Sequence, residues 1–319
     1  MVYHLTEQLA RRGHQVELFA SGDSRVSVPL HAVVQQATLD APGMTTYLDK
    51  EYEARNTMAL YRQSERFDVL HGHWPTLAPY FSPFSPRPTV LTYHYIEPHL
   101  HEYYRREMPN VHPVCISEAQ RRLLGDPDLP VVPNGLDTQQ IPFRAEPDDY
   151  FIVVGRIVPN KGIGHAIRVA RTAGVKLVVV GAVSPYLPWS APYFEAEVKP
   201  FIDGERVHWI EGLSNEDTLR LVAGARGFLF PLQWDEPFGL AVAEAQACGT
   251  PVLTYRKGSM PEVVAHGETG FVVDDEAQLI DAVKRVGEIE RAACRKRIEE
   301  RFSLDRMISA YEEIYHRLA

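Results

Sequence analysis

Two hydrophobic patterns alternate along the chain. Short apolar runs, typical of buried strands, are separated by longer segments in which apolar side chains recur at helical spacing. The runs predict strands near residues 15–20, 33–34, 68–71, 88–93, 111–116, 150–154, 175–181, 207–210, 227–232 and 251–254. The intervening segments predict helices at 2–12, 50–66, 162–173, 192–202, 214–224 and around residue 244. Strands joined by helices of this length form parallel sheets with right-handed crossovers, so we expect an α/β protein.

This alternation falls into two blocks. A charged, proline-bearing stretch at 144–149 separates them and is the best linker candidate. With 319 residues in the chain, each block is large enough to bury a core of its own. We therefore expect two Rossmann-like domains, an N-terminal one over 1–145 and a C-terminal one over 146–303.

The segment Glu236-Pro-Phe-Gly-Leu-Ala-Val-Ala-Glu244 carries the most chemical information, because two glutamates flank a Pro-Phe-Gly turn. An apolar run precedes it and a glycine ends the helical pattern after it, which predicts a strand, a turn and a helix. Pro237 suits the first helical turn, where no N–H is needed. The N–H groups of Phe238, Gly239 and Leu240 then form an open helix N-terminus, which favours a phosphate. Carboxylates accept hydrogen bonds from sugar hydroxyls, so the segment predicts a nucleotide-sugar site.

Other motifs occur in a characteristic order: His71-Gly-His73, Thr92-Tyr-His94, Cys115-Ile-Ser-Glu118, Val132-Pro-Asn-Gly-Leu-Asp137, Gly155-Arg-Ile-Val-Pro-Asn-Lys-Gly162 and Gly267-Glu-Thr-Gly270. With the two glutamates, this ordered set resembles the large retaining glycosyltransferase family 4. Members of that family have the GT-B fold, in which two Rossmann-like domains face a central cleft. The resemblance covers nearly the whole chain. It also implies that the amphipathic last segment, 304–319, crosses back to join the N-terminal domain.

The resemblance implies a donor site in the C-terminal domain. Arg156 and Lys161 are expected to clamp the diphosphate of a nucleotide sugar and to stabilise the charge that develops as it leaves. Glu244 is expected to bind the ribose hydroxyls, and Glu236 to face the transferred sugar. Gly181 follows a predicted strand at a position that often contacts the nucleotide in this fold.

Three more candidates lie in the N-terminal block. His94 follows an apolar strand at its carboxyl end, where open sheets bind ligands, and the resemblance implies that it contacts the transferred sugar or phosphate as a catalytic residue. Ser117 opens a helix, and both a donor-binding role and a purely structural N-cap remain open. Asn134 lies in a Pro-Asn-Gly turn, for which donor binding and turn chemistry are equally good explanations.

The first residues depart from the family. A Rossmann domain opens with a strand and a glycine-rich turn before its first helix, whereas this sequence begins within that helix. We therefore expect an incomplete N-terminal sheet with exposed strand edges, which another copy of the chain could cover. Either the sequence is truncated, or the protein tolerates an incomplete N-terminal sheet.

Composition narrows the choice of partners. The net charge of −9 provides no electrostatic footprint for nucleic acid. Cys115, Cys248 and Cys294 are widely spaced, which predicts reduced thiols in a cytoplasmic protein. No run approaches the ~20 apolar residues of a membrane span, and the N-terminus lacks the apolar core of a signal peptide. Peripheral membrane contact stays open, because many family members glycosylate lipids.

The histidines offer a rival hypothesis. His71 and His73 lie on one side of an extended segment, so that a metal site is conceivable. The next three histidines along the chain are His94, His99 and His101. Acidic partners at ligand spacing are not evident, and we expect no metal. The triplet Asp126-Pro-Asp128 matches an Asp-x-Asp metal motif only superficially, since it lies in a loop far from a suitable strand end.

The sequence therefore predicts a retaining, metal-independent glycosyltransferase. It would transfer a hexose from a nucleotide diphosphate sugar, of the UDP-glucose or GDP-mannose type, to a hydroxyl of a small molecule, glycan or lipid. No cofactor is expected, because the donor is itself a substrate. One alternative is a nucleotide-sugar-binding protein with little or no turnover, motivated by the missing glycine-rich loop. Another is a phosphorylase or epimerase of the same fold.

Overall fold

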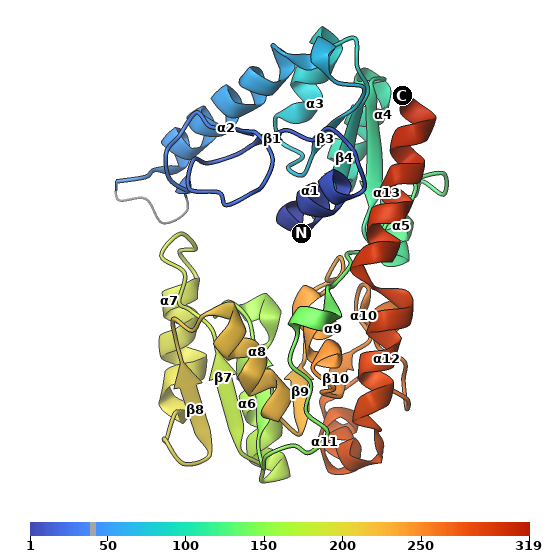
Figure 1. The fold of residues 1–319 in the computed structure, drawn as a ribbon. Coiled ribbons are helices and arrows are strands. Elements are labelled where there is room, and N and C mark those ends of the chain that lie inside the picture. The colour runs from blue at the N-terminus through green and yellow to red at the C-terminus, as the bar shows by residue number, and fades with distance from the viewer. Residues whose placement is uncertain (39–42) are drawn as a thin grey trace. The chain divides into compact units, whose positions relative to one another are not determined.

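The computed structural model describes residues 1–38 and 43–319. The chain divides into two compact units (Figure 1). Unit 1 comprises Met1–Gly135 and Leu304–Ala319, and unit 2 comprises Leu136–Ser303. Each unit is described by itself below.

The junction between the units lies between residues 135 and 136, not between 145 and 146. The linker-like stretch at 144–149 belongs to unit 2 because its polar groups are bonded there. The Arg144 guanidinium donates to the Asp148 carboxylate at 2.7 Å, and the Asp148 N–H donates to the carbonyl of Gly224 at 2.7 Å. Charge and proline content alone did not reveal these bonds.

Unit 2 is built on one parallel sheet. Its strands lie in the order β8-β7-β6-β9-β10-β11. The first strand of the unit is thus central, and the chain adds strands first on one side and then on the other. The bounds are β6 Phe151–Val154, β7 Leu177–Val180, β8 Val207–Ile210, β9 Gly227–Phe230, β10 Val252–Tyr255 and β11 Gly270–Val273. This is the strand order of a dinucleotide-binding Rossmann sheet.

The helices of unit 2 up to residue 263 lie in the connections between these strands, and the last two follow the final strand. They are α6 Ile163–Ala173, α7 Ser190–Tyr193, α8 Asn215–Gly224, α9 Leu240–Ala247, α10 Met260–Val263, α11 Glu276–Arg285 and α12 Arg291–Arg301. The central strands read as continuous apolar runs because both faces of the sheet are covered. Phe151, Ile152, Phe228 and Leu229, for example, are completely buried.

Unit 1 contains two parallel sheets within its described residues. One pairs β1 Leu18–Phe19 with β2 Leu30–His31, and the other has the order β3 Leu70–Gly72, β4 Thr89–Tyr93 and β5 Val111–Cys115. The helices are α1 Val2–Arg11, α2 Thr46–Tyr61, α3 Ala78–Phe81, α4 Pro98–Glu107, α5 Glu118–Leu124 and α13 Leu304–Leu318.

Two apolar layers cover the faces of the larger sheet in unit 1. Along β4, Val90 belongs to a core with α1 and α13, whereas Leu91 belongs to a core with α4 and α5. Successive side chains of a strand point to opposite faces, which explains this separation. Helix α13 lies beside α1 although the two are far apart in sequence (Figure 1). Their exposed surfaces are also joined by ion pairs from Arg12 to Asp305 and Glu312.

The strands predicted in the first 40 residues are the least accurate. The expected strand at 15–20 is reduced to two residues, and the one expected at 33–34 lies at Leu30–His31. The helix expected at 192–202 is divided into α7, a π-helical segment at Phe194–Val198 and a 3₁₀ turn at Lys199–Phe201. Pro200 removes a backbone donor there, so a regular helix cannot continue.

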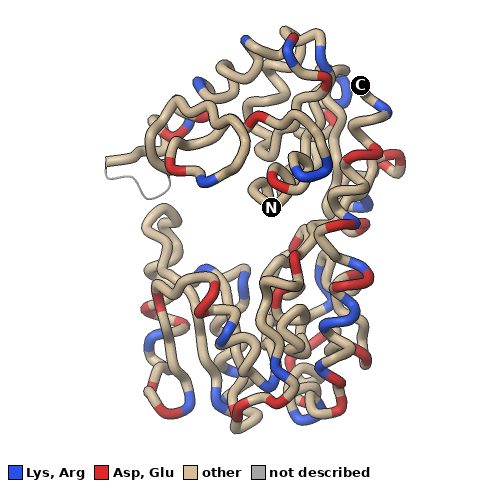
Figure 2. Tube along the Cα trace, viewed as in Figure 1, with Lys and Arg blue, Asp and Glu red and all other residues tan. Residues whose placement is uncertain are grey.

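Charged residues of both signs are interspersed along both units (Figure 2). A negatively charged ligand must therefore be recognised by local groups rather than by a broad positive field. Among the residues described, no helix has the length and apolarity needed to cross a membrane. Cys115, Cys248 and Cys294 are free and buried, and burial raises the pKa of each thiol to about 12.

Candidate active site

The strand order of unit 2 defines where a ligand can bind. The chain after β6 turns to one side of the sheet, and the chain after β9 turns to the other. Ligands of open α/β sheets bind at such a switch point, beyond the carboxyl ends of the strands. The loop at 155–162 follows β6 and the loop at 231–239 follows β9. These loops carry Arg156, Lys161 and Glu236, three of the residues predicted from sequence.

Lys161 and Glu236 meet at this switch point. The Lys161 ammonium lies 2.5 Å from a carboxylate oxygen of Glu236, and each side chain is 14% exposed. The indole N–H of Trp234 donates to the same oxygen at 2.9 Å. The ammonium also lies 5.2 Å from the centre of the Trp234 ring and 5.8 Å from that of Phe230. Lysine and glutamate neutralise each other here, so an incoming anion must compete with Glu236 for the ammonium.

Two glycines allow the loops of this site to approach closely. Gly162 has φ +71°, and a Cβ there would lie 2.0 Å from the carbonyl oxygen of Pro231. At Gly181 a Cβ would lie 1.9 Å from the carbonyl oxygen of Gly155. Both positions therefore require glycine for steric reasons. The predicted nucleotide contact of Gly181 stays a prediction.

Helix α9 begins later than the sequence suggested. Its first residue is Leu240, and Gly239 is the N-cap with φ +82°. Pro237 precedes the helix instead of occupying its first turn. Phe238 is 3% exposed and packs edge-to-face against Phe302, with ring centres 5.6 Å apart.

The start of α9 leaves backbone N–H groups without a partner in the helix. Within the described residues, the N–H groups of Leu240 and Ala241 bond no backbone carbonyl. The helix dipole adds partial positive charge at the same place. Over the same described residues, the N–H groups of Phe238 and Gly239 also bond no backbone carbonyl, although the Phe238 ring packs in the core. A phosphate-binding role for the predicted N–H groups at 238–240 stays a prediction.

Glu244 lies one turn further along α9, on the same helical face as Leu240. Its carboxyl group is mostly buried, and burial raises its pKa to about 6. Burial disfavours the charged form because the carboxylate loses hydration. A carboxylate held in this way is a strong acceptor for ligand hydroxyl groups.

Arg156 is exposed and follows β6 directly. Its side chain makes no hydrogen bond or ion pair with the described residues, so the structure does not bring it into contact with Lys161 or Glu236. Its role as a diphosphate clamp stays a prediction. Within the same loop, the side-chain carbonyl oxygen of Asn160 is buried without a hydrogen-bond partner in the described part of the chain.

Sequence reasoning assigned no role to Asn160 or Trp234. Asn160 lies inside a motif that was quoted for its cations, and its position beside Lys161 was the available signal. Trp234 lies two residues before Glu236, but only the fold shows that its indole reaches back to the carboxylate.

His94 belongs to unit 1 and follows β4, as predicted. Its Nε2 lies 3.3 Å from Nδ1 of His73, which follows β3. The His71 ring stacks on that of His73 with centres 4.2 Å apart. Burial is the main cause that lowers the pKa of all three imidazoles, that of His71 to about 3. These rings are therefore uncharged at neutral pH.

The rings of His71, His73 and His94 contact hydroxyl groups and one another. Nδ1 of His71 lies 2.6 Å from the Tyr315 hydroxyl, and Nε2 lies 2.8 Å from the Thr92 hydroxyl. Both nitrogens of this ring are thus engaged. Over the described residues, no group of three or more His, Cys, Asp or Glu side chains is arranged to hold a metal ion.

Ser117 and Asn134 are both buried in unit 1. The Ser117 hydroxyl accepts from the Gln120 N–H at 3.0 Å and caps helix α5, so the structural reading of this residue is confirmed. Asn134 is 3% exposed beside the junction of the units. Donor binding by either residue stays a prediction.

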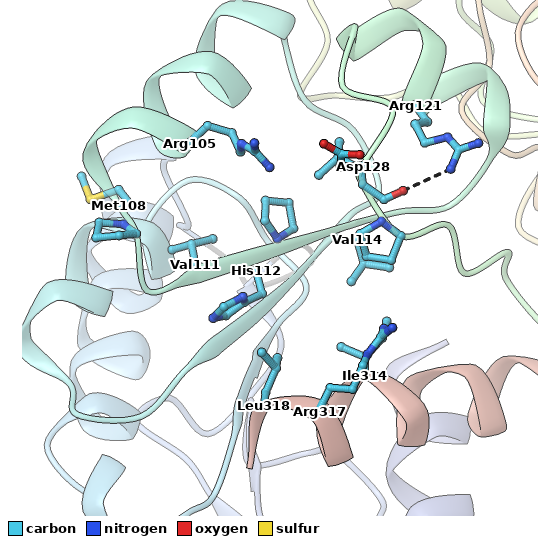
Figure 3. A pocket seen from close by; sticks show the side chains of 14 residues that line it. Arg105, Met108, Val111, His112, Val114, Arg121, Asp128, Ile314, Arg317 and Leu318 are labelled. Atoms are coloured by element: carbon cyan, nitrogen blue, oxygen red, sulfur yellow. Dashed lines mark hydrogen bonds between the residues drawn. The ribbon is translucent and has the colours of Figure 1, made fainter.

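A separate open cavity of about 840 Å³ lies in unit 1 (Figure 3). It is bordered by β5, the end of α4 and the end of α13, and Arg105, Arg121, Arg317 and His112 contribute to its lining. Arg121 donates to the carbonyl of Leu129 at 3.4 Å. None of the predicted site residues lines this cavity, so it is distinct from the groups described above.

Comparison with known proteins agrees with this geometry. The family model described as "Glycosyl transferases group 1" matches residues 137–301, and the one described as "Glycosyltransferase Family 4" matches residues 1–140. Alpha-maltose-1-phosphate synthase of Mycolicibacterium smegmatis is 32% identical over 61% of this chain and 58% of its own length. D-inositol 3-phosphate glycosyltransferase of Mycobacterium sp. strain KMS is 35% identical over 41% of this chain and 31% of its own length.

The chain thus spans less than two thirds of either relative. Solved structures extend the likeness in fold. Sucrose-phosphate synthase of Thermosynechococcus elongatus has a TM-score of 0.80 at 20% identity, over 99% of this chain and 92% of its own. Anabaena HepE, solved in complex with UDP and glucose, has a TM-score of 0.75 at 17% identity, over 99% and 95%. The chain therefore belongs to the group 1 glycosyl transferases, within the glycosyltransferase family 4 proteins of GT-B fold.

Proposed function

We propose that this protein is a retaining, metal-independent hexosyltransferase that uses a nucleotide diphosphate sugar as donor. One observation carries the proposal: Lys161 and Glu236 meet at the switch point of the unit 2 sheet, in loops that lead into the open N-terminus of α9. A cation, a helix N-terminus and a carboxylate are the groups that a diphosphate and an attached sugar require.

The diphosphate is proposed to bind Lys161 and the N–H groups of Leu240 and Ala241. Its arrival draws the Lys161 ammonium away from Glu236, and the carboxylate is thereby released to accept hydrogen bonds from the hexose hydroxyls. Glu244 accepts from the ribose hydroxyls one helical turn further on. Arg156 is proposed as a second cation for the diphosphate, supported by its place directly after β6.

The reaction replaces the bond between the anomeric carbon and the diphosphate oxygen by a bond to an acceptor oxygen. Negative charge develops on the departing diphosphate, and Lys161 and the α9 N-terminus stabilise that charge. In the proposed front-face course, the acceptor attacks from the side of the leaving group, whose oxygen takes the acceptor proton. His94 of unit 1 is proposed to hydrogen-bond the transferred sugar.

UDP-glucose is the first donor to test, because Anabaena HepE has been solved with UDP-glucose and with UDP and glucose. GDP-mannose is the second. Acceptors should include sugar phosphates and glycans, because relatives are named for maltose 1-phosphate, inositol phosphate and glycogen synthesis.

The decisive experiment measures transfer and hydrolysis of labelled UDP-glucose and GDP-mannose in the presence of EDTA, with NMR of the product's anomeric configuration. We expect turnover in EDTA, retained configuration, and a loss of about 10²- to 10³-fold in kcat for Lys161→Met. Lys199→Met is the matched control, because Lys199 is exposed and, among the residues that the structure describes, pairs only with Glu195 four positions earlier.

Three outcomes would contradict the proposal. Binding without turnover across the acceptors would favour a nucleotide-sugar-binding protein. An inverted product would exclude the retaining course. Equal activity of the Lys161 and Lys199 variants would show that the diphosphate does not bind Lys161 at the switch point.

A further inference from the structure

The ends of β3 and β4 in unit 1 carry two histidines that contact each other. His73 Nδ1 and His94 Nε2 are 3.3 Å apart, and the two rings are nearly parallel, with centres 5.5 Å apart and an interplanar angle of 22°. This contact uses one nitrogen of His94. Its other nitrogen, Nδ1, has no hydrogen-bond partner among the described residues and is left for a ligand.

The His73 ring stacks on that of His71, whose position is fixed by hydrogen bonds. The two ring centres are 4.2 Å apart, with 29° between the planes. His71 is bonded through both nitrogens, to Tyr315 at 2.6 Å and to Thr92 at 2.8 Å. The Thr92 hydroxyl lies 2.7 Å from that of Tyr311 on the same helix as Tyr315. Thr92 is fully buried, so this chain of hydroxyls and imidazole has little freedom to rearrange.

Only one proton can lie between His73 and His94 when both are uncharged, because a neutral imidazole carries one N–H and one lone pair. Two arrangements satisfy the contact. If His94 donates its Nε2–H to Nδ1 of His73, both rings have the Nε2–H form that is usual for histidine. If His73 donates, both rings must adopt the less common Nδ1–H form. The first arrangement is therefore favoured, and it leaves a lone pair on Nδ1 of His94.

We propose that His73 is a positioning residue for His94: it accepts the Nε2–H of His94 and so fixes that ring with Nδ1 as an acceptor for a substrate hydroxyl. This assignment rests on the proposed function for the role of His94 in turnover, whereas the proton position itself does not. The sequence suggested only a possible metal-ligand role for His73, whereas the positioning role follows from the ring contact between the ends of the parallel strands.

The proton position can be read without substrate by NMR of protein labelled with ¹⁵N at histidine. In the wild type we expect His94 to have a protonated Nε2 with a slowly exchanging proton and an unprotonated Nδ1. His73→Phe keeps a ring for stacking but removes the acceptor, so the Nε2 proton should exchange rapidly and its signal should disappear. His73→Asn offers a carbonyl oxygen close to the former Nδ1 position and should preserve the signal.

His99→Phe is the matched control, because His99 is exposed and lies outside the cluster. It should leave the His94 signals unchanged. A proton on Nδ1 of His94 in the wild type, or an Nε2 proton signal that persists in folded His73→Phe, would overturn the proposal. If the His73→Phe variant does not fold, His73→Asn still tests the proposal. Loss of the His94 Nε2 proton signal in folded His73→Asn would contradict the proposal.

Kinetics supply the second readout. We expect His73→Phe to lower kcat by about 10- to 100-fold through misplacement of His94, with a donor KM within about twofold of wild type. His73→Asn should recover most of the loss. If the wild type shows no turnover, the proposed function fails while the NMR result still decides the proton position. If turnover is normal and His73→Phe matches wild type, the positioning role fails alone.

Discussion

Glu236 and Glu244 show how two carboxylates in one nine-residue segment acquire different properties. The Glu236 side chain is only 14% exposed, but an ammonium and an indole N–H lie within hydrogen-bond distance of its carboxylate. For Glu244, burial raises the pKa to about 6. The buried carboxylate costs stability when no ligand is present. Residues placed for ligand binding often carry such a cost.

Replacement of Glu244 by Gln should therefore stabilise the ligand-free protein above pH 6. The folded-state pKa of about 6 exceeds the ordinary value of 4.5, so the folded state holds the proton more tightly. Stability from this group is lost as pH rises through this window, by about 2 kcal/mol in full. The glutamine variant avoids that loss, and its excess stability should be near zero at pH 4 and greatest at pH 7.5.

Urea unfolding at both pH values measures this difference, and UDP titration measures the accompanying loss of nucleotide affinity. A variant as stable as wild type at pH 7.5 would show that Glu244 is not buried in its charged form. Unchanged UDP affinity would show that Glu244 does not bind the ribose hydroxyls.

The sequence predicted which residues belong to the candidate site, but it did not predict the contacts between them. The sequence identified Glu236 and Glu244 by their spacing around Pro-Phe-Gly, and Lys161 by its place in the motif at 155–162. It did not reveal that Lys161 and Glu236 pair with each other, because that contact depends on two loops 75 residues apart in the chain. Tyr311 and Tyr315 were likewise unremarkable members of an amphipathic helix until the fold placed them against β3 and β4.

At the scale of elements, the two glycines at the ends of helix α6 show how packing beside the site differs from packing away from it. Both of its ends are glycines with nearly equal backbone angles, Gly162 with φ +71° at the start and Gly174 with φ +72° at the end. They differ in surroundings, because a Cβ at Gly174 would meet nothing within 4 Å, whereas one at Gly162 would meet the Pro231 carbonyl at 2.0 Å. The start of α6 is thereby fixed against the loop that leads to Glu236.

This pair provides an internally controlled prediction. Gly174→Ala should cost about 1–2 kcal/mol, the strain of a left-handed alanine. Gly162→Ala carries the same strain together with a clash against backbone, and should cost about 3 kcal/mol or more. Thermal and urea unfolding give the two values. Equal losses would show that the two loops are not in contact, and nucleotide binding should weaken only in Gly162→Ala.

Elements with strong apolar runs were predicted closely, as in β4, β5, β6 and β8. Elements held by long-range contacts were not. Within the described part of the chain, the short strands β1 and β2 pair only with each other, so their local pattern did not define their ends. Helix α9 starts three residues after Pro237, because Phe238 is drawn into the core against Phe302.

At the scale of the whole molecule, the two units differ in the segments that form them: unit 1 combines two separate segments of the chain. Unit 2 is a continuous segment, and it contains every group proposed to bind the diphosphate and ribose. A nucleotide should therefore stabilise unit 2 selectively. At a hundredfold excess over Kd the gain is about 2.7 kcal/mol.

Hydrogen exchange with and without UDP tests this selectivity. We expect slower exchange in peptides that cover 155–162 and the start of α9, and little change in peptides of β5 and α5. Protection confined to unit 1 would contradict a donor site at the switch point of unit 2. Glu244→Gln should reduce the protection, and Lys199→Met should not.

Helix α13 has a consequence for how the protein is made. Its side chains Met307, Ile308 and Tyr311 complete the core of a unit whose other residues are synthesised first, before the whole of unit 2. On the ribosome, the segment at 136–303 can thus finish folding as soon as it emerges, while the earlier one must wait with an uncovered sheet face. The hydrogen bonds of His71 to Tyr315 and of Thr92 to Tyr311 form only once α13 has been synthesised, so the histidine cluster takes its final form after unit 2 has emerged.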